Sequence, residues 1–359
     1  MNTRFKETGK KLGIWLVIAA IFFVSFPFRL QAAEETQAAE TVVTEEPAAE
    51  NPTTDEPTTD DPTPEEPSDP EPVNPHTKDG LYKEGGKLLY YKGGVFTKST
   101  GIVADLFTRR WVYVEKGVFK KVTGVAKRLT DKKYLYVKKG IFSKATGAAK
   151  RISNGKWVYV KKGVFNKRTG VVKKIGKKEW IYVLKGTQTQ KISKIVLTKA
   201  DEKAGLKKHF NEVYAKAVVA NVTNKSMTEA QKIKALFQYT VTKFNSTGNP
   251  RIPHYHGKDW PVVYAYDMFG PRKGGNCMSY ASSFAYLAKA AGCKNVYACN
   301  SGGHAWVEVN GRVYDPEQYH DTARKIYNYA YSNPTIKHYW GAISDYKTNP
   351  FKRVKMAAF

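Results

Sequence analysis

The chain has 359 residues, and its 59 Lys and Arg side chains against 32 Asp and Glu give a formal net charge of +27. A quaternary amine is itself a cation. The positive charge therefore argues against such a ligand for the basic part of the chain, because like charges repel. Only three cysteines are present, so at most one disulfide bridge can form within the chain.

The N-terminus has the pattern of a secretory signal peptide. Four basic residues precede an apolar run over residues 12–28, and Leu30-Gln31-Ala32-Ala33 then offers a cleavage site of small residues. We therefore expect residues 1–33 to be a signal peptide, with retention of the run as a membrane anchor as the alternative. After cleavage we expect no membrane span. No cysteine follows the run, which argues against a lipoprotein.

Residues 34–77 are rich in Glu, Asp, Thr and Pro, and they hold few apolar side chains. Burial in such a segment is too small to offset the entropy lost on ordering, so we expect a disordered acidic linker. At roughly 3 Å per residue it could reach about 100 Å from an attachment point.

The next segment, residues 78–196, contains an internal repeat with a period of 23 residues. Each unit has alternating apolar residues around a Lys-Gly turn, which predicts one β-hairpin per unit in an all-β array. One hairpin is too small to be stable alone, so neighbouring units must share a core. The period is visible in Gly94, Gly117, Gly140, Gly163 and Gly186, and again in Gly101, Gly124, Gly147 and Gly170.

These units resemble the aromatic-rich wall-binding repeats of secreted Gram-positive proteins. Some members of that group bind choline in aromatic cages, but here 30 Lys and Arg against five acids lie between residues 81 and 196. This charge favours an anionic wall polymer as the partner. Nucleic acid carries similar charge, but the chain has no nucleic-acid motif and we expect no such partner. The repeat tyrosines either bind ligand or form the hairpin core: Tyr113, Tyr136, Tyr159 and Tyr182.

Residues 197–359 are expected to form the catalytic module. Helical periodicity covers residues 201–220 and 228–244, and Ser226-Met227-Thr228-Glu229 is the expected capping box of the second helix. A loop over 249–261 contains His254 and His256, for which a surface or cleft-lining role is favoured over a metal site. The Tyr-rich stretch 319–340 either lines a substrate groove or packs as a helix.

Cys277 follows Gly274-Gly275-Asn276 and precedes a predicted helix over 278–291 that Gly292 ends. The sulfur is therefore expected at a helix N-terminus, where unpaired N–H groups and the helix dipole favour a thiolate. The other two cysteines, Cys293 and Cys299, are separated by a predicted strand. They are too far apart for a bridge, so we expect two buried thiols.

His304 begins a predicted strand over 304–309, and Asn310-Gly311 indicates a hairpin turn. Counting outward from the turn, Trp306 pairs with Asp315 and His304 pairs with Glu317. Asp315 is then the diagonal neighbour of His304, within reach of an imidazole–carboxylate hydrogen bond. The carboxylate would hold the ring so that its other nitrogen faces a thiol.

The sequences around Cys277, His304-Ala305-Trp306 and Val313-Tyr314-Asp315-Pro316 resemble the transglutaminase-like superfamily. The resemblance implies a papain-like α+β fold, with Cys277 as nucleophile, His304 as base and Asp315 as orienting residue. The clustered acidic calcium loops of eukaryotic transglutaminases are absent from the sequence, so no metal or other cofactor is implied.

The backbone N–H of Cys277 is one expected oxyanion donor. Trp260 or Tyr264 could be the second, although core packing explains either aromatic equally well.

Together these features predict a secreted, cell-surface cysteine acyl-transfer enzyme that acts on protein or peptide amides. A cysteine protease or amidase that cleaves peptides or peptidoglycan with the same triad is the first alternative. A non-catalytic, wall-bound adhesin is the second. The residues do not distinguish an amine from water as the second nucleophile.

Overall fold

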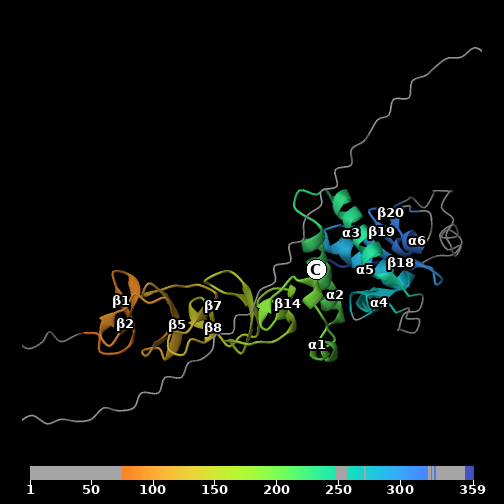
Figure 1. The fold of residues 1–359 in the computed structure, drawn as a ribbon. Coiled ribbons are helices and arrows are strands. Elements are labelled where there is room, and N and C mark those ends of the chain that lie inside the picture. Colours follow the sequence, from red (N-terminus) through yellow and green to blue (C-terminus); the bar gives the residue numbers. More distant parts are fainter. Residues whose placement is uncertain (1–74, 248–256, 271, 322–324, 326, 329–351) are drawn as a thin grey trace, which may run out of the picture. The chain divides into compact units, whose positions relative to one another are not determined.

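The structure is a computed structural model that describes residues 75–247, 257–270, 272–321, 325, 327–328 and 352–359 (Figure 1). The expected signal peptide, most of the expected linker, the His254–His256 segment and most of the Tyr-rich stretch lie outside these residues. Within them, no helix has the length and apolar character needed to cross a membrane.

The N-terminal part of the described chain forms one large antiparallel sheet of 15 strands. The strands are β1 (Gly80–Glu84), β2 (Lys87–Lys92), β3 (Val95–Phe96), β4 (Gly101–Asp105), β5 (Arg110–Glu115), β6 (Val118–Phe119), β7 (Gly124–Lys127), β8 (Tyr134–Lys138), β9 (Ile141–Phe142), β10 (Gly147–Lys150), β11 (Trp157–Lys161), β12 (Val164–Phe165), β13 (Gly170–Lys173), β14 (Trp180–Leu184) and β15 (Thr187–Gln188).

Strand pairing recurs in a fixed register along this sheet. A long strand pairs with a short one across a Lys-Gly turn in β5–β6, β8–β9, β11–β12 and β14–β15. Each long strand also pairs with the short strand of the following hairpin. These contacts join Val112 to Ile141, Leu135 to Val164 and Val158 to Thr187. Each hairpin is therefore completed by its neighbour.

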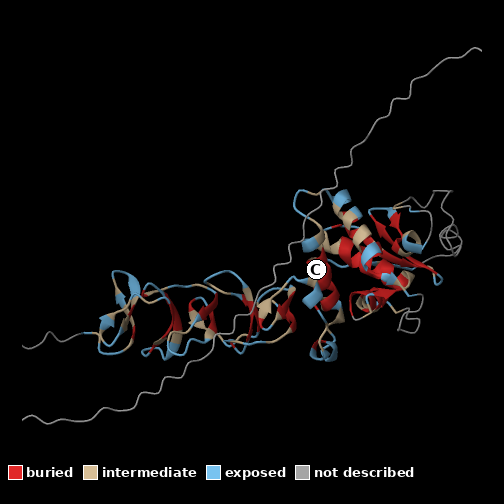
Figure 2. Ribbon diagram, in the orientation of Figure 1, coloured by how far each residue is buried: buried red, intermediate tan, exposed pale blue. Residues whose placement is uncertain are grey.

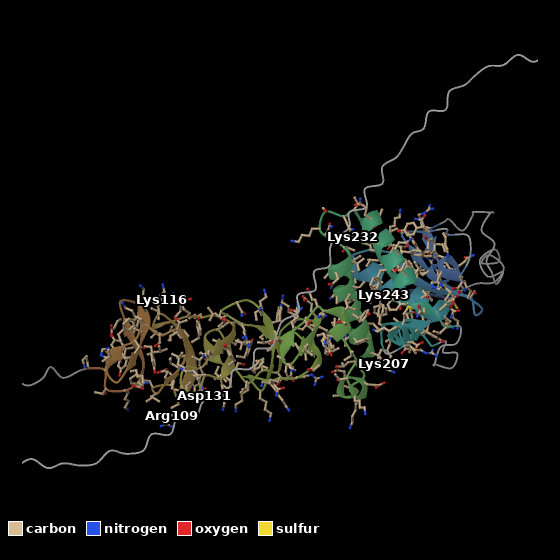
Figure 3. All side chains as sticks on the ribbon, in the orientation of Figure 1. Arg109, Lys116, Asp131, Lys207, Lys232 and Lys243 are labelled. Atoms are coloured by element: carbon tan, nitrogen blue, oxygen red, sulfur yellow. The ribbon has the colours of Figure 1, made fainter. Side chains whose placement is uncertain are left out.

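The four Lys-Gly turns place an exposed lysine in the left-handed backbone region, with φ between 48° and 52°. A Cβ strains this conformation, and among residues that have one such turns favour Asn, because its short polar side chain can hydrogen-bond locally. The following glycine is required by space as well: a Cβ on Gly117 would lie 2.2 Å from the carbonyl oxygen of Thr97. Figure 3 shows Lys116 extending away from the ribbon. The lysines are Lys116, Lys139, Lys162 and Lys185.

The repeat tyrosines are buried, with 0–9% of their surface exposed. Each belongs to an apolar cluster that also contains residues of adjacent strands. The tyrosines therefore form the core that neighbouring hairpins share, whereas the four turn lysines lie on the exposed surface.

Asp201 ends the series of sheet contacts. A Cβ on Gly101, Gly124 or Gly147 would meet a backbone carbonyl of the next unit, whereas at Gly170 it would meet the Asp201 carboxylate. The fully buried carboxylate accepts a hydrogen bond from the Val171 N–H at 3.0 Å and pairs with Arg168. Asp201 thus takes the place that a further unit would fill.

The C-terminal part mixes helices with a four-stranded antiparallel sheet of order β20-β19-β18-β21. Its elements are η1 (Ile192–Lys194), α1 (Lys199–Lys203), α2 (Lys207–Val222), α3 (Glu229–Lys243), β16 (Asn245–Ser246), α4 (Trp260–Phe269), β17 (Gly274–Gly275), α5 (Cys277–Ala290), β18 (Val296–Asn300), β19 (Ala305–Val309), β20 (Arg312–Tyr314), α6 (Pro316–Asp321) and β21 (Lys352–Lys355).

Helix α5 is the centre of this part. It packs against β18 and β19 of the sheet and against α2, α3 and α4. Eleven of its 14 residues are buried, and Figure 2 shows buried residues along the helix and the sheet beside it. Because α5 is held on several sides by apolar contacts, its first residue has a fixed position.

Two helix predictions were wrong in detail. The helix expected over 201–220 is divided into α1 and α2, because Gly205 adopts φ +67° between them. The capping box of α3 is formed by Thr228 and Gln231 rather than by Ser226 and Glu229. The Ser226 hydroxyl instead donates to Asn224.

Candidate active site

Cys277 is the first residue of α5 and is partly exposed. Asn276 caps the helix by accepting a hydrogen bond from the Ser279 N–H at 3.4 Å. The two preceding glycines permit close packing. A Cβ on Gly274 would lie 2.4 Å from the Asn245 carbonyl oxygen, and one on Gly275 would lie 2.3 Å from Ser279. The placement of the sulfur at a helix N-terminus agrees with the prediction.

His304 lies one residue before β19, at the end of the turn that leaves β18. The turn is closed by a hydrogen bond from the Ser301 N–H to the His304 carbonyl at 2.9 Å, and Gly302 adopts φ +95° within it. The Gly302 N–H donates to Asn300 at 2.7 Å. The imidazole is only 3% exposed, so its position is set by the turn and the surrounding core.

Asp315 lies between β20 and α6 and uses its two carboxylate oxygens for different contacts. Oδ2 accepts a hydrogen bond from His304 Nε2 at 2.6 Å, and Oδ1 accepts one from the Gln318 N–H at 3.1 Å. The carboxylate is 2% exposed. One contact orients the ring, and the other fixes the first turn of α6.

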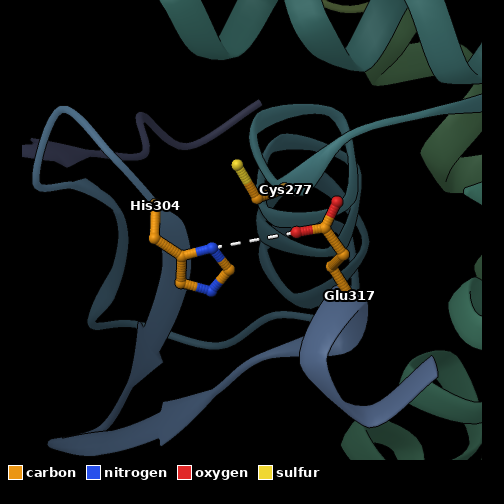
Figure 4. A group of neighbouring side chains, drawn as sticks. All are labelled: Cys277, His304 and Glu317. Carbon is orange, nitrogen blue, oxygen red and sulfur yellow. Dashed lines mark ion pairs between the residues drawn. The ribbon is translucent and has the colours of Figure 1, made fainter. Parts of the chain in front are cut away.

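The other ring nitrogen of His304 faces Cys277. A ring nitrogen of His304, the Cys277 sulfur and a carboxylate oxygen of Glu317 lie within 4.8 Å of one another, and Figure 4 shows the latter two on the Nδ1 side of the ring. Burial by itself lowers the pKa of His304, but the charge and hydrogen bond of Asp315 and the contact with Cys277 hold it well above its ordinary value. The ring can therefore carry a proton beside the sulfur.

Glu317 is the site residue to which the sequence assigned no role. Strand counting placed it opposite His304, but Pro316 starts α6, so the side chain returns toward the ring from a helix. Its Oε2 lies 3.7 Å from His304 Nδ1, and the Cys277 backbone N–H acts on the carboxyl group and lowers its pKa. The first expected oxyanion donor therefore has a carboxyl group near it in this structure. Pro316, directly after Asp315, was the one feature of the sequence that indicated the end of the strand at this point.

Trp260 and Tyr264 both lie on α4 and are 1% and 0% exposed, as expected for core residues. The Trp260 indole nitrogen has no hydrogen-bond partner among the described residues, and the ring lines a pocket beside β21. That pocket contains none of Cys277, His304 and Asp315, so a second oxyanion donor at Trp260 or Tyr264 stays a prediction.

Cys277, His304 and Glu317 are also the one group in the described chain whose donor atoms lie close enough to share a metal ion. Cys293 and Cys299 are buried and unbridged, which confirms the expectation of two structural thiols.

The chain is similar to the transglutaminase-like superfamily over the segment that contains this site. Residues 216–318 match the family model of the transglutaminase-like superfamily, and the matched segment contains Cys277, His304 and Asp315. No curated protein and no solved structure matches the chain. Members of the superfamily are usually cysteine acyltransferases or peptidases.

Proposed function

We propose that the protein is a secreted, surface-bound cysteine acyl-transfer enzyme that acts on protein or peptide amides. The observation that supports this proposal is the buried imidazole of His304, with Nε2 on Asp315 and Nδ1 facing the Cys277 sulfur. Within this constellation a base is positioned beside a nucleophile and is itself oriented by a carboxylate.

The reaction divides into two transfers at the same carbonyl carbon. The Cys277 thiolate attacks the substrate carboxamide, the C–S bond forms, and His304 Nδ1–H gives its proton to the departing nitrogen as the C–N bond breaks. A second nucleophile then attacks the thioester and gives a proton to Nδ1 as the C–S bond breaks. Water as that nucleophile makes the enzyme a peptidase or amidase, and an amine makes it a crosslinking enzyme.

Alkylation of the thiol tests the catalytic proposal directly. At pH 6 we expect iodoacetamide to modify Cys277 rapidly in the parent and at least about tenfold more slowly in His304→Ala, because the imidazolium stabilises the thiolate electrostatically. Mass analysis of the modified peptides assigns the label, with Cys293 and Cys299 as internal controls. Equal, slow rates in both proteins would favour a non-catalytic adhesin.

We further propose a four-part organisation: a signal peptide (1–33), an acidic linker (34–77), basic wall-binding repeats (78–196) and a catalytic domain (197–359). The proposal for the repeats is supported by their charge and by the four turn lysines. At each of these turns the backbone conformation favours Asn, yet lysine is present and exposed. A row of cations suits an anionic wall polymer such as a teichoic-type chain.

The quadruple variant Lys116→Asn, Lys139→Asn, Lys162→Asn and Lys185→Asn tests this role. We expect at least about fourfold weaker binding to purified walls at low salt, because four favourable charge contacts of roughly 0.2–1 kcal/mol each are lost. The thermal midpoint should stay equal or rise, because Asn tolerates the turn conformation. Cosedimentation and a thermal scan measure the two effects.

A matched control removes the same charge from the catalytic part through Lys199→Asn, Lys203→Asn, Lys225→Asn and Lys234→Asn. All four side chains are exposed. If this control weakens binding equally, net charge and not the row of turn lysines is responsible. Binding that persists after anionic polymers are stripped from the walls would contradict the electrostatic account altogether.

A further inference from the structure

Glu317 lies where the second substrate of the proposed reaction must approach. In the second transfer the nucleophile has to reach the thioester carbon at Cys277 and give its proton to His304 Nδ1. A nucleophile that is hydrogen-bonded to Nδ1 lies about 3 Å from that nitrogen. Glu317 Oε2 is 3.7 Å from the same nitrogen and within 4.8 Å of the sulfur. The carboxylate therefore borders the position of the incoming group.

The charges around Glu317 favour a cation at this position. Asp315 and Asp321 act on its carboxylate, as does His304 in the opposite sense, and the carboxylate also lies near Tyr280 of α5. The exposed ring of His320 is hydrogen-bonded to the Asp321 carboxylate through Nδ1. This acidic surrounding differs from the strongly basic chain as a whole. An ammonium group entering beside Nδ1 would meet Glu317 at contact distance and would feel the negative charges of Asp315 and Asp321.

The protonation of Glu317 is suited to exchange with an amine. Burial raises the pKa of the Glu317 carboxyl to about 7, and the charges of Asp315 and Asp321 add to the rise. The His304 charge and the Cys277 N–H act against it. Near neutral pH the group can thus both accept a proton and release it.

We propose that Glu317 forms an acyl-acceptor subsite for primary ammonium groups, so that the thioester is resolved by an amine in preference to water. This inference rests on the proposed acyl transfer at Cys277. It assigns to Glu317 the choice of second nucleophile, for which Cys277, His304 and Asp315 by themselves show no preference.

The proton balance of the step is complete with the residues present. The bound ammonium gives one proton to the Glu317 carboxylate, and the resulting amine attacks the thioester carbon. The C–N bond forms, a second proton passes to His304 Nδ1, and the C–S bond breaks to return the thiolate. Glu317 releases its proton to solvent as the amide product leaves.

The test is a partition measurement on the full chain with Glu317→Gln. Casein serves as the glutamine-bearing probe, a labelled diamine (cadaverine) as the cationic acceptor and hydroxylamine as an uncharged acceptor. Ammonia release reports the first transfer, and the ratio of amine product to hydrolysed product reports the second. We expect Glu317→Gln to lower the ratio for cadaverine at least about tenfold, with little change in the ratio for hydroxylamine.

Asp321→Asn is the matched control, because Asp321 lies on the same helix and acts on the site only through its charge. A fall of equal size in both variants would overturn the subsite in favour of a general field effect. An unchanged ratio in Glu317→Gln, or a parent enzyme that releases ammonia but forms only hydrolysed product, would also overturn it.

If Glu317→Gln does not fold, the parent alone decides the question. Its preference for cadaverine over hydroxylamine must then fall when added salt screens the ammonium, and a preference that ignores salt would overturn the subsite. Absence of both ammonia release and Cys277 alkylation in the parent is a different result, since it contradicts the acyl-transfer proposal itself.

Discussion

Asp315→Asn is expected to lower kcat for thioester formation by on the order of 10³- to 10⁴-fold while the fold is retained. Asp315 Oδ2 accepts a hydrogen bond from His304 Nε2 at 2.6 Å, which leaves Nδ1 able to accept the proton of Cys277. An asparagine amide can donate to Nε2 instead, and the ring proton then lies on Nδ1. A neutral imidazole whose single proton lies on Nδ1 cannot accept the proton of the Cys277 thiol at that nitrogen.

The asparagine is a well-matched substitution because Asp315 has two separate contacts. Its amide oxygen can still accept the hydrogen bond from the Gln318 N–H, so the start of α6 keeps its capping contact. Single-turnover ammonia release measures the rate, and thermal unfolding measures the fold. A variant with near-parent rate would show that Asp315 does not set the tautomer of His304. A variant that loses its fold would leave the question to Asp315→Glu, for which partial activity is expected.

Asp201→Ala is expected to destabilise the protein by roughly 3 kcal/mol, because it leaves a buried donor and a charged partner without their acceptor. The Asp201 carboxylate is fully buried, accepts the Val171 N–H at 3.0 Å and pairs with Arg168, whose side chain is 30% exposed. The partial exposure of Arg168 lets water recover part of the loss, which holds the estimate at the lower end for a broken buried pair. Urea unfolding followed by circular dichroism measures the change.

Two controls separate the roles of Asp201. Glu202→Ala removes a neighbouring acid whose side chain is 54% exposed, and we expect a change within about 0.5 kcal/mol. Asp201→Asn keeps an acceptor for the Val171 N–H but removes the charge, so its cost should be intermediate. If Asp201→Ala proves as mild as Glu202→Ala, the carboxylate is not needed to complete the last unit of the sheet.

The relation between His304 and Asp315 could be predicted from sequence because it depends on a local count. The Asn310-Gly311 turn fixed the register, and the observed ladder agrees from Val309–Arg312 to Val307–Tyr314. Counting failed one step beyond, because Pro316 ended the strand and began α6. Glu317 therefore approaches the ring from a helix, and no periodic pattern contains that information.

Other features depend on contacts between segments that are distant in sequence. Asp201 reads as one polar residue of an amphipathic helix, and its burial follows only when Gly170 and Val171 approach it. The choice of capping box at α3 has a different cause. Ser226 and Thr228 are both suitable N-cap residues for this helix. The Ser226 hydroxyl donates to the Asn224 side chain instead, so Thr228 is the N-cap.

Because all hairpins pair in the same register, the fold does not restrict how many hairpin units the sheet contains. Each internal unit presents the same two edges, as the pairings of Leu135 with Val164 and of Val158 with Thr187 show. The first and the last described strand pairs have contacts of their own: Asp105 accepts a hydrogen bond from the Leu81 N–H, and Asp201 accepts one from the Val171 N–H. Insertion or loss of whole units between these two ends would therefore preserve every contact type, and it would change the length of the sheet without any change at the thiol.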